Sequence, residues 1–440
     1  MDSVQVIGAG LAGSEAALQL ARRGIPVRLI EMRPEKMTPA HETQACAELV
    51  CSNSLKSEKP TTAAGTLKVE LDVLDSRLLK IARQHRVPAG NALAVDRSAF
   101  SAAVTAAIEA EPLITRQNAE ITALDPERLS ILATGPLTSE ALSEALSGIV
   151  GCDALSFYDA SAPIVADESL DRRRIFAASR RDDDNHDYLN SALTQEEYEH
   201  FYTELVAAER VQHRDFEQRE LFAACRPIEE VARSGPGALR FGALKPVGVD
   251  DPRTGRWPYA LVQLRAENAQ RSAYNLVGFQ TNLTFPEQKR VFSLIPGLEH
   301  AEFLRYGVMH RNTFVDAPRA LSSDLSLKHA RNLFLAGQLM GTEGYLEAVA
   351  GGLIAALMVT ARIRRLTQQP QLPPGTTTLG ALLRYATDPA TNDYQPMHVN
   401  FGLIEPLAPP VRRKRERFQA YHERAAEAMR QWRGKNRGLY

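Results

Sequence analysis

An α/β fold built around a parallel sheet is predicted by three features of the sequence. A β-rich run near the N-terminus leads directly into a glycine-rich turn and then a helix. Much later in the chain, a second β-rich run again leads into glycines and a helix of small residues. A long basic stretch ends the chain. Alternating strands and helices favour a parallel sheet. We therefore expect a Rossmann-like nucleotide-binding domain, an inserted α+β domain and a basic helical C-terminal segment.

The bulk composition is that of an ordinary globular protein. With 440 residues, 44% hydrophobic and 24% charged, the chain is long enough for two domains or one domain with an insertion. Its net charge of -1 does not favour any partner. The four cysteines match no common zinc spacing, so we expect reduced thiols, no metal site and a cytoplasmic location. We see no run of about 18 apolar residues, and so expect no membrane span.

The first nucleotide-binding element occupies the N-terminal residues. A strand is predicted at Val4–Ile7, a glycine-rich turn at Gly8–Gly13 and a helix at Ser14–Arg22. A second strand at Val27–Ile30 ends at Glu31. This order of strand, glycines, helix, strand and acid is the dinucleotide-binding pattern. An ordinary tight turn is the alternative interpretation of the glycines alone.

Each part of this G-x-G-x-x-G pattern has its own task. Gly8 permits the tight turn, Gly10 lets the backbone approach a pyrophosphate, and Gly13 lets the helix pack closely on the strand. The helix N-terminus offers free N–H groups to phosphates. Glu31 stands where a carboxylate accepts hydrogen bonds from ribose hydroxyls. The expected phosphate loop is Gly8, Ala9, Gly10, Leu11, Ala12 and Gly13.

The second glycine-rich element favours FAD over NAD. A strand at Asn332–Ala336 runs into Gly337, Gln338 and Gly344, and a small-residue helix follows. FAD is long and needs a second wall from a distant segment, whereas NAD domains usually do not. The helix N-terminus would face the electron-rich edge of the flavin. A buried helix with small residues for close packing is the alternative. Between the two elements, Ile131–Gly135 has the strand-and-turn pattern that closes the first nucleotide fold in flavoproteins.

Two of the four cysteines have surroundings suited to chemistry. Cys51 lies in a polar, hydroxyl-rich turn, and Cys225 precedes an arginine and a proline. Such settings expose a thiol and lower its pKa. Thiolates attack electron-poor double bonds, including C6 of uracil. For Cys46 and Cys152 we expect the role of small hydrophobic side chains.

Several segments together resemble one known family. They are VIGAGLAGSEAA, EMRPEKMTPAH, ELVCSNSLKS, VPAGNALAVDR, KPVGVDDPRTG, YGVMHRNT, AGQLMGTEGYLEA and QPMHVNFGLIEPL. Along nearly its whole length the chain resembles the bacterial folate- and FAD-dependent tRNA (uracil-5-)-methyltransferases. The general flavin motifs also resemble the tRNA wobble-uridine flavoproteins, but these are markedly longer and lack a counterpart of the Cys51 segment.

The resemblance implies a defined reaction. The methylene of 5,10-methylenetetrahydrofolate goes to C5 of a T-loop uridine in tRNA (position 54), reduced FAD supplies electrons, and NADH or NADPH reduces the flavin. Cys51 and Cys225 occupy the positions of the family's two cysteines, and which one attacks uracil stays open. His310 is the candidate for packing against the pterin ring, with Arg311 near polar tails. The alternatives are a flavin oxidoreductase with Cys51 as redox thiol, or a tRNA-binding flavoprotein whose flavin is structural.

The C-terminal segment has a face suited to RNA. Between residues 412 and 440 there are ten basic and three acidic residues. The apolar residues that recur at helical spacing are Phe418, Tyr421, Ala425, Ala428 and Trp432. A helix docked on one side and basic on the other would bind phosphates; a solvated charged helix is the alternative. We divide the chain into an FAD-binding domain (1–155 and 300–370), an insertion (156–299) and this C-terminal segment (371–440).

Overall fold

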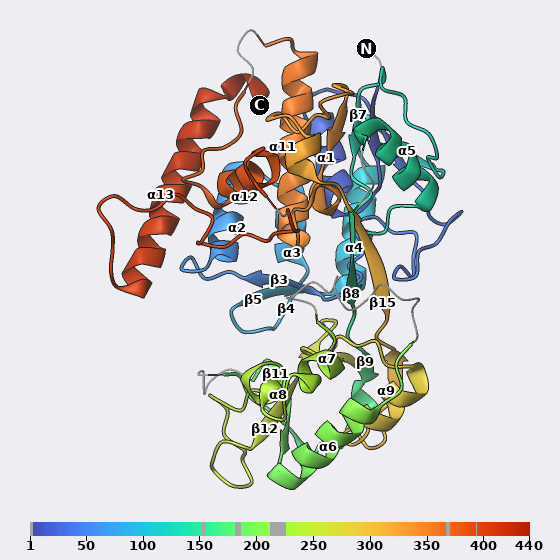
Figure 1. Ribbon diagram of the computed structural model, residues 1–440, viewed down its shortest axis with the longest axis vertical. Helices are drawn as coiled ribbons and strands as arrows, with labels where there is room; N and C mark the ends of the chain where they lie inside the picture. Colours follow the sequence, from blue (N-terminus) through green and yellow to red (C-terminus); the bar gives the residue numbers. More distant parts are fainter. Residues whose placement is uncertain (1–2, 152–154, 181–185, 212–225, 367–369, 393) are drawn as a thin grey trace.

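The computed structural model has two lobes (Figure 1). It describes residues 3–151, 155–180, 186–211, 226–366, 370–392 and 394–440. One lobe contains both ends of the chain, and the other is inserted between them. The chain passes between the lobes along two antiparallel strands, β8 (Leu155–Ala160) and β15 (Met309–Phe314). Each lobe has its own hydrophobic core.

A five-stranded parallel sheet forms the centre of the larger lobe. Its order is β16-β7-β1-β2-β6, and every pair is parallel. The strands are β1 (Val4–Ile7), β2 (Val27–Glu31), β6 (Ile114–Asn118), β7 (Ser130–Leu132) and β16 (Leu333–Leu335). The predicted strands at both glycine-rich elements are confirmed. Since β7 lies between β1 and β16, the turns after these three strands meet at one edge of the sheet.

Two helices begin at the glycine-rich turns and pack against each other. α1 (Leu11–Ala21) starts three residues before the predicted helix, directly after Gly10. α11 (Tyr345–Ile363) starts directly after Gly344. A Cβ on Gly352 of α11 would lie 2.0 Å from the carbonyl oxygen of Ala12, so the helices touch backbone to backbone. Both helices therefore start at the sheet edge, which leaves their first N–H groups facing the same region.

Helix α11 corrects the expectation that no segment is apolar enough to span a membrane. By length and composition Tyr345–Ile363 is such a helix, and it is the one candidate among the described residues. However, 83% of its apolar window is buried inside the protein. The helix is apolar on all sides because it lies in the core between α1 and the C-terminal elements (Figure 1).

A smaller antiparallel sheet stands on the side of the larger lobe that faces the inserted lobe (Figure 1). It has the order β3-β5-β4, formed by β3 (Ser54–Ser57), β5 (Ala92–Val95) and β4 (Arg86–Val87). The helices that join or follow these strands are α2 (Ala63–Val73), α3 (Arg77–Gln84) and α4 (Arg97–Glu109), whereas α5 (Glu140–Val150) follows β7 of the parallel sheet. The segment leading into β3 carries Cys51, so this sheet holds the thiol at the junction of the lobes.

The inserted lobe is an antiparallel sheet with helices. Its strand order is β10-β11-β12-β13-β9-β14. The strands are β9 (Ile164–Ala166), β10 (Ile175–Ala177), β11 (Tyr188–Leu193), β12 (Ala260–Ala266), β13 (Ala273–Leu276) and β14 (Phe303–Arg305). The helices are α6 (Gln195–Ala207), α7 (Ile228–Arg233), α8 (Ala238–Phe241) and α9 (Phe285–Phe292). Strand β14 lies beyond residue 299, so this sheet extends past the boundary we drew from the sequence.

The C-terminal segment packs on the larger lobe. Helix α10 (Ala317–Ala320) precedes β16, and α12 (Thr378–Thr387) and α13 (Lys414–Lys435) follow α11. The predicted basic helix is confirmed, with Tyr421, Ala425, Ala426, Met429 and Trp432 buried. Two of its basic residues face inward: Arg424 donates to Pro406 O, and Arg433 donates to Val73 O. The exposed basic face is therefore smaller than the sequence suggests.

Candidate dinucleotide site and cysteine loop

A cavity of about 1000 Å³ opens at the edge of the sheet where the glycine-rich turns meet. The turn after β7 contributes Ala133, Thr134 and Gly135. Residues from both predicted elements line it: Gly8, Gly10, Leu11, Ala12, Glu31, Gln338 and Gly344. Ala9, Gly13 and Gly337 are not among its lining residues. The cavity therefore joins two elements that are far apart in the sequence, as expected for one long ligand.

The glycine loop fits a pyrophosphate. Gly8 has φ +98°, and a Cβ there would lie 2.6 Å from Ala133 O. A Cβ on Gly13 would lie 1.8 Å from Gly8 O, which leaves no room for a larger residue. In contrast, a Cβ on Gly10 would meet no atom within 4 Å, so it would project into open space. No side chain caps the N-terminus of α1, so its N–H groups are available to phosphate oxygens.

Glu31 is tied to the glycine loop through its carboxylate. Its Oε2 accepts a hydrogen bond of 2.8 Å from the N–H of Ala9, and its Oε1 accepts one of 2.9 Å from Nε of Arg33. Burial acts to raise the pKa of Glu31, but the hydrogen bond and charge of Arg33 outweigh it, so the net pKa is lowered. Oε1 also accepts a hydrogen bond of 3.2 Å from the backbone N–H of Arg33, so the lone pair that remains for a ribose hydroxyl is on Oε2. Glu31 thus braces the loop and remains able to bind ribose.

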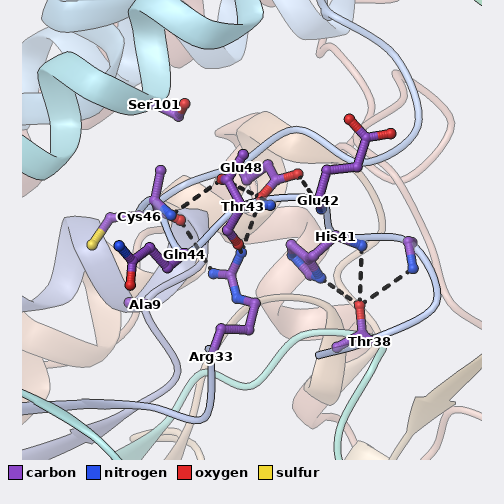
Figure 2. Close-up of polar contacts among 12 residues, drawn as sticks. Ala9, Arg33, Thr38, His41, Glu42, Thr43, Gln44, Cys46, Glu48 and Ser101 are labelled. Carbon is purple, nitrogen blue, oxygen red and sulfur yellow. Dashed lines mark hydrogen bonds and ion pairs between the residues drawn. The ribbon is translucent and has the colours of Figure 1, made fainter. Parts of the chain in front are cut away.

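Arg33 is a buried cation that sequence reasoning missed. Its side chain is 2% exposed and forms ion pairs with Glu31 (2.9 Å) and Glu48 (3.1 Å). Figure 2 shows Arg33 pointing at Thr43 and Glu48, and Thr43 Oγ1 donates to the same carboxylate at 2.7 Å. The sequence signal was the Arg33–Pro34 pair, which follows β2 after a single residue. Arg33 fixes residues 33–48 as one wall of the cavity.

The same wall carries a neutral histidine. His41 Nδ1 lies 2.6 Å from Oγ1 of Thr38, and both residues line the cavity (Figure 2). Burial, together with the charge of Arg33, lowers the pKa of His41 to about 4. The imidazole is therefore uncharged at neutral pH and adds polar contacts without adding charge.

The second glycine-rich element forms the opposite wall. Gly337 has φ +69°, and a Cβ there would lie 2.8 Å from Cβ of Ala12, so this glycine allows the turn to pack on α1. Gly344 has φ +115° and precedes α11, whose N-terminus has no side-chain cap. Tyr345, the first residue of α11, also lines the cavity. Tyr345 lies between this cavity and the loop that carries Cys51.

Cys51 lies beside this wall, at the junction of the two lobes. The backbone N–H groups of Cys51 and Ser52 donate to the hydroxyl of Tyr345 at 2.9 and 3.0 Å. The thiol donates to the carbonyl of Ala160 in β8 at 3.7 Å. Val50, the preceding residue, lines the cavity. Tyr345 therefore ties the loop, which we define as residues 50–53, to the edge of the cavity.

Two arginines, the buried Arg265 and the partly buried Arg97, hold the cysteine loop and the residue before it from the other side. Arg265 of the inserted lobe donates to Ser52 Oγ and Asn53 Oδ1, both at 2.8 Å. Arg97 donates to Leu49 O and pairs with Glu267 at 2.9 Å. Burial lowers the pKa of Arg265 despite the nearby carboxylate of Glu267. For Arg97, burial acts to lower the pKa, but the ion pair with Glu267 outweighs it, and the pKa is raised. Two cations thus lie at the cysteine loop.

An ion pair between the exposed side chain of Lys56 and the buried Glu347 completes the connection between loop and helix. Lys56 has φ +61°, and its Nζ lies 2.8 Å from Oε1 of Glu347, which is fully buried. The same carboxylate oxygen accepts a hydrogen bond from Val399 N at 3.1 Å. A Cβ on Gly344 would lie 2.4 Å from Oε2 of Glu347, so only glycine leaves space for this carboxylate.

The remaining predicted residues fall into three groups. Cys46 is fully buried, and burial raises the pKa of its thiol, as a small hydrophobic side chain requires. Cys152 and Cys225 lie outside the described residues. His310 and Arg311 belong to β15, where their backbones pair with Asp159 and Tyr158 of β8.

The parallel sheet, the glycine loop and the distant second wall define an FAD-binding protein of the Rossmann-like α/β class. A family profile described as "GIDA: Glucose inhibited division protein A" matches residues 3–367. Two curated relatives are named methylenetetrahydrofolate--tRNA-(uracil-5-)-methyltransferase TrmFO. The protein from Carboxydothermus hydrogenoformans is 51% identical over 98% of this chain and 99% of its own length. The one from Moorella thermoacetica is 53% identical over 97% of both. The chain therefore belongs to the same family as these TrmFO proteins.

Solved structures of Aquifex aeolicus GidA share the fold. Two crystal forms match with TM-scores of 0.69 and 0.70 at 16% identity, over 99% and 100% of this chain. The match covers 75% and 76% of the GidA chains, whereas it covers nearly all of the two TrmFO relatives. The GidA chains are therefore longer than this chain, whereas the two TrmFO relatives have nearly its length.

Proposed function

We propose that this protein is a folate- and FAD-dependent tRNA (uracil-5-)-methyltransferase. The observation that carries the proposal is about 50% identity to TrmFO proteins over almost the whole of both chains. The cavity at the sheet edge and the cysteine loop beside it supply the two sites that such a reaction needs. The substrates are 5,10-methylenetetrahydrofolate and a T-loop uridine of tRNA, and the product is 5-methyluridine.

The cavity residues would hold FAD in an extended form. The first N–H groups of α1 would bind the pyrophosphate, with Gly10 leaving the space, and Glu31 would bind the adenosine ribose. Gln338 and Gly344 would form the wall at the flavin end. When bound, the flavin supplies the electrons that reduce the transferred one-carbon unit to a methyl group. NADH or NADPH is the reductant we propose, and the cytoplasm is the proposed location.

Cys51 is the proposed catalytic thiol of the described residues. Uracil C5 becomes nucleophilic when a thiolate adds to C6. The positive charges of Arg97 and Arg265 favour a thiolate at this position. Cys225 is the proposed partner, and which of the two thiols attacks uracil stays open. His310 and Arg311 remain proposed folate contacts, because their strand leads from the inserted lobe back to the cavity edge.

The exposed basic residues of α13 are a proposed tRNA contact. The cluster at its start comprises Arg412, Arg413, Lys414 and Arg415, all exposed. Phosphate contacts of this kind make affinity fall steeply with salt. Replacing Lys414 and Arg415 by glutamate should weaken tRNA binding and reduce its salt dependence, with FAD content unchanged.

A single assay tests the proposed function. Purified protein is mixed with tRNA lacking 5-methyluridine, NADPH and 14C-labelled methylenetetrahydrofolate, and label in the T-loop is counted. We expect incorporation by the wild type and none by Cys51→Ala, which should keep its flavin absorbance. Cys46→Ala is the matched control, because its buried thiol has no proposed part in the reaction.

The competing functions give different results in this assay. NADPH oxidation that needs neither tRNA nor folate, with no label in tRNA, would favour a simple flavin oxidoreductase. Label at a wobble uridine would favour the other tRNA-modifying group. Wild-type turnover by Cys51→Ala would remove Cys51 from the reaction without touching the proposed activity.

A further inference from the structure

One surface of the inserted lobe combines exposed aromatic and basic side chains. We define this aromatic–basic face by Phe241, Lys245, Arg256 and Trp257. Phe241 is 88% exposed and Trp257 is 57% exposed, the two largest values among the exposed large hydrophobic residues of the described chain. Large apolar side chains gathered on a surface mark sites of interaction.

The two segments that carry these residues lie against each other. Arg240 donates from Nε to Tyr259 O at 2.8 Å, and its guanidinium stacks over the Tyr259 ring at 3.7 Å. Leu261 N donates to Leu244 O at 3.1 Å. The end of α8 is thereby fixed beside the start of β12. The two segments that carry the aromatic–basic face are therefore held in place relative to each other.

The charge of the stretch that carries this face is net positive, with four basic and two acidic residues between positions 238 and 258. Lys245 and Arg256 are exposed and have no ion pair or side-chain hydrogen bond within the described ranges. Of the two acids between residues 238 and 258, Asp251 is buried and paired with Arg253 at 2.8 Å. Asp250 is the other. A hollow of about 870 Å³ is lined by Lys245, by Gly242, which follows Phe241 in the chain, and by Arg180 and Gly278 among others.

We propose that the aromatic–basic face binds unpaired nucleotides of the tRNA substrate, an inference that rests on the proposed function. Exposed aromatic rings stack on unpaired bases, and nearby cations bind the adjoining phosphates. The chemistry favours RNA over an acidic protein surface, because an acidic partner would use Lys245 and Arg256 but not the exposed rings. This contact lies in the inserted lobe and is separate from α13.

Strand β12 links this face to the cysteine loop. Trp257 precedes the strand, and Arg265 near its far end contacts Ser52 and Asn53. At about 3.3 Å per residue, eight residues separate the two by roughly 25 Å. A folded tRNA spans this distance easily, so one RNA can occupy the face and place another nucleotide at Cys51.

The test measures binding of undermodified tRNA to the FAD-loaded protein by filter retention. Phe241→Ala and Trp257→Ala should each weaken binding about fivefold or more. Lys245→Glu should weaken it and lower the slope of log K against log salt by about one. The controls are Phe285→Ala and Lys289→Glu on α9, which lies elsewhere on the lobe (Figure 1); they should bind as the wild type does.

Tryptophan emission gives an independent measurement. The chain has two tryptophans, and Trp432 is 7% exposed, so tRNA should quench Trp257 selectively. Trp257→Phe should retain binding and lose the quench. If the Phe241 and Trp257 variants bind tRNA with unchanged affinity and still methylate it, the face does not bind tRNA. The proposed function would still hold. A wild type that binds no tRNA overturns both. A dimer that Phe241→Ala dissociates, with RNA affinity unchanged, assigns the face to a second copy instead.

Discussion

The glycine loop and the cysteine loop lie at the same cavity edge but are built in different ways. The glycine loop comes from one continuous stretch, and its shape depends on backbone that touches backbone. The cysteine loop is held by side chains from three distant segments: Tyr345, Arg97 and Arg265. The comparison teaches that a ligand-binding turn can be specified locally, whereas the surroundings of a reactive thiol require the whole fold.

The largest expected effect tests the backbone contact in the glycine loop. Gly13→Ala places a Cβ 1.8 Å from Gly8 O, and backbone must move to relieve the clash. We expect a loss of more than about 3 kcal/mol in unfolding free energy and loss of FAD. Urea unfolding and flavin absorbance measure both.

Gly10→Ala is the control that separates folding from binding. Its Cβ meets nothing within 4 Å, so the FAD-free protein should unfold at the same urea concentration as the wild type. FAD should bind at least about tenfold more weakly, since the methyl group enters the ligand's space. Equal destabilisation by both substitutions would contradict the distinction between the two glycines.

The next effect concerns the wall that joins Glu31 to the rest of the cavity. Arg33→Met leaves the buried carboxylates of Glu31 and Glu48 without their cation. Removing one partner of a buried ion pair costs about 3–5 kcal/mol. Lys36→Met breaks the exposed pair with Glu120 and should cost less than about 1 kcal/mol. Similar costs in thermal or urea unfolding would show that Arg33 does not support this wall.

Glu70, a buried carboxylate without a cation beside it, should make the unfolding free energy fall as pH rises. Glu70 caps α12 by accepting from Thr378 N (2.7 Å) and Leu379 N (2.9 Å), and burial raises its pKa to about 7. The folded state therefore holds the proton more tightly than the unfolded state, whose pKa is near 4.5. This contribution is fully present below pH 4.5 and is lost as pH rises through about 7, roughly 3 kcal/mol in all.

Glu70→Gln checks the pH prediction. The variant should flatten the decline in unfolding free energy between pH 5 and 8, because an amide does not titrate. The same decline in the variant and the wild type would assign it to other groups.

The smallest expected effect concerns the positive charge at the cysteine loop. Arg265→Met removes one of the two cations beside Cys51, and we expect alkylation of Cys51 by iodoacetamide at pH 7 to slow severalfold, with its pH profile moved upward. Arg265→Lys should recover part of the rate, since the charge returns without the two-donor geometry. A rate change with an unmoved pH profile would mean that Arg265 only orders the loop.

Much of the larger lobe was predictable because its signals are local. The strand at Val4–Ile7, the turn at Gly8–Gly13 and the acid at Glu31 follow one another directly, and each is decided by neighbouring backbone. The second wall at Gly337–Gly344 was also recognisable from its glycines. The basic helix near the C-terminus was predicted from spacing, but its inward-facing Arg424 and Arg433 were not, because partner carbonyls cannot be read from the sequence.

What the sequence by itself determined is the dinucleotide-binding turn, the identity of the candidate thiols and the membership of a family. Tertiary structure decided which residues surround Cys51, that Arg33 joins Glu31 to Glu48, and that an apolar 19-residue helix is a core element. The physical reason is the distance along the chain over which each feature is determined. Turn geometry depends on φ angles and adjacent atoms, whereas the charge around a thiol depends on groups that meet only when distant segments pack together.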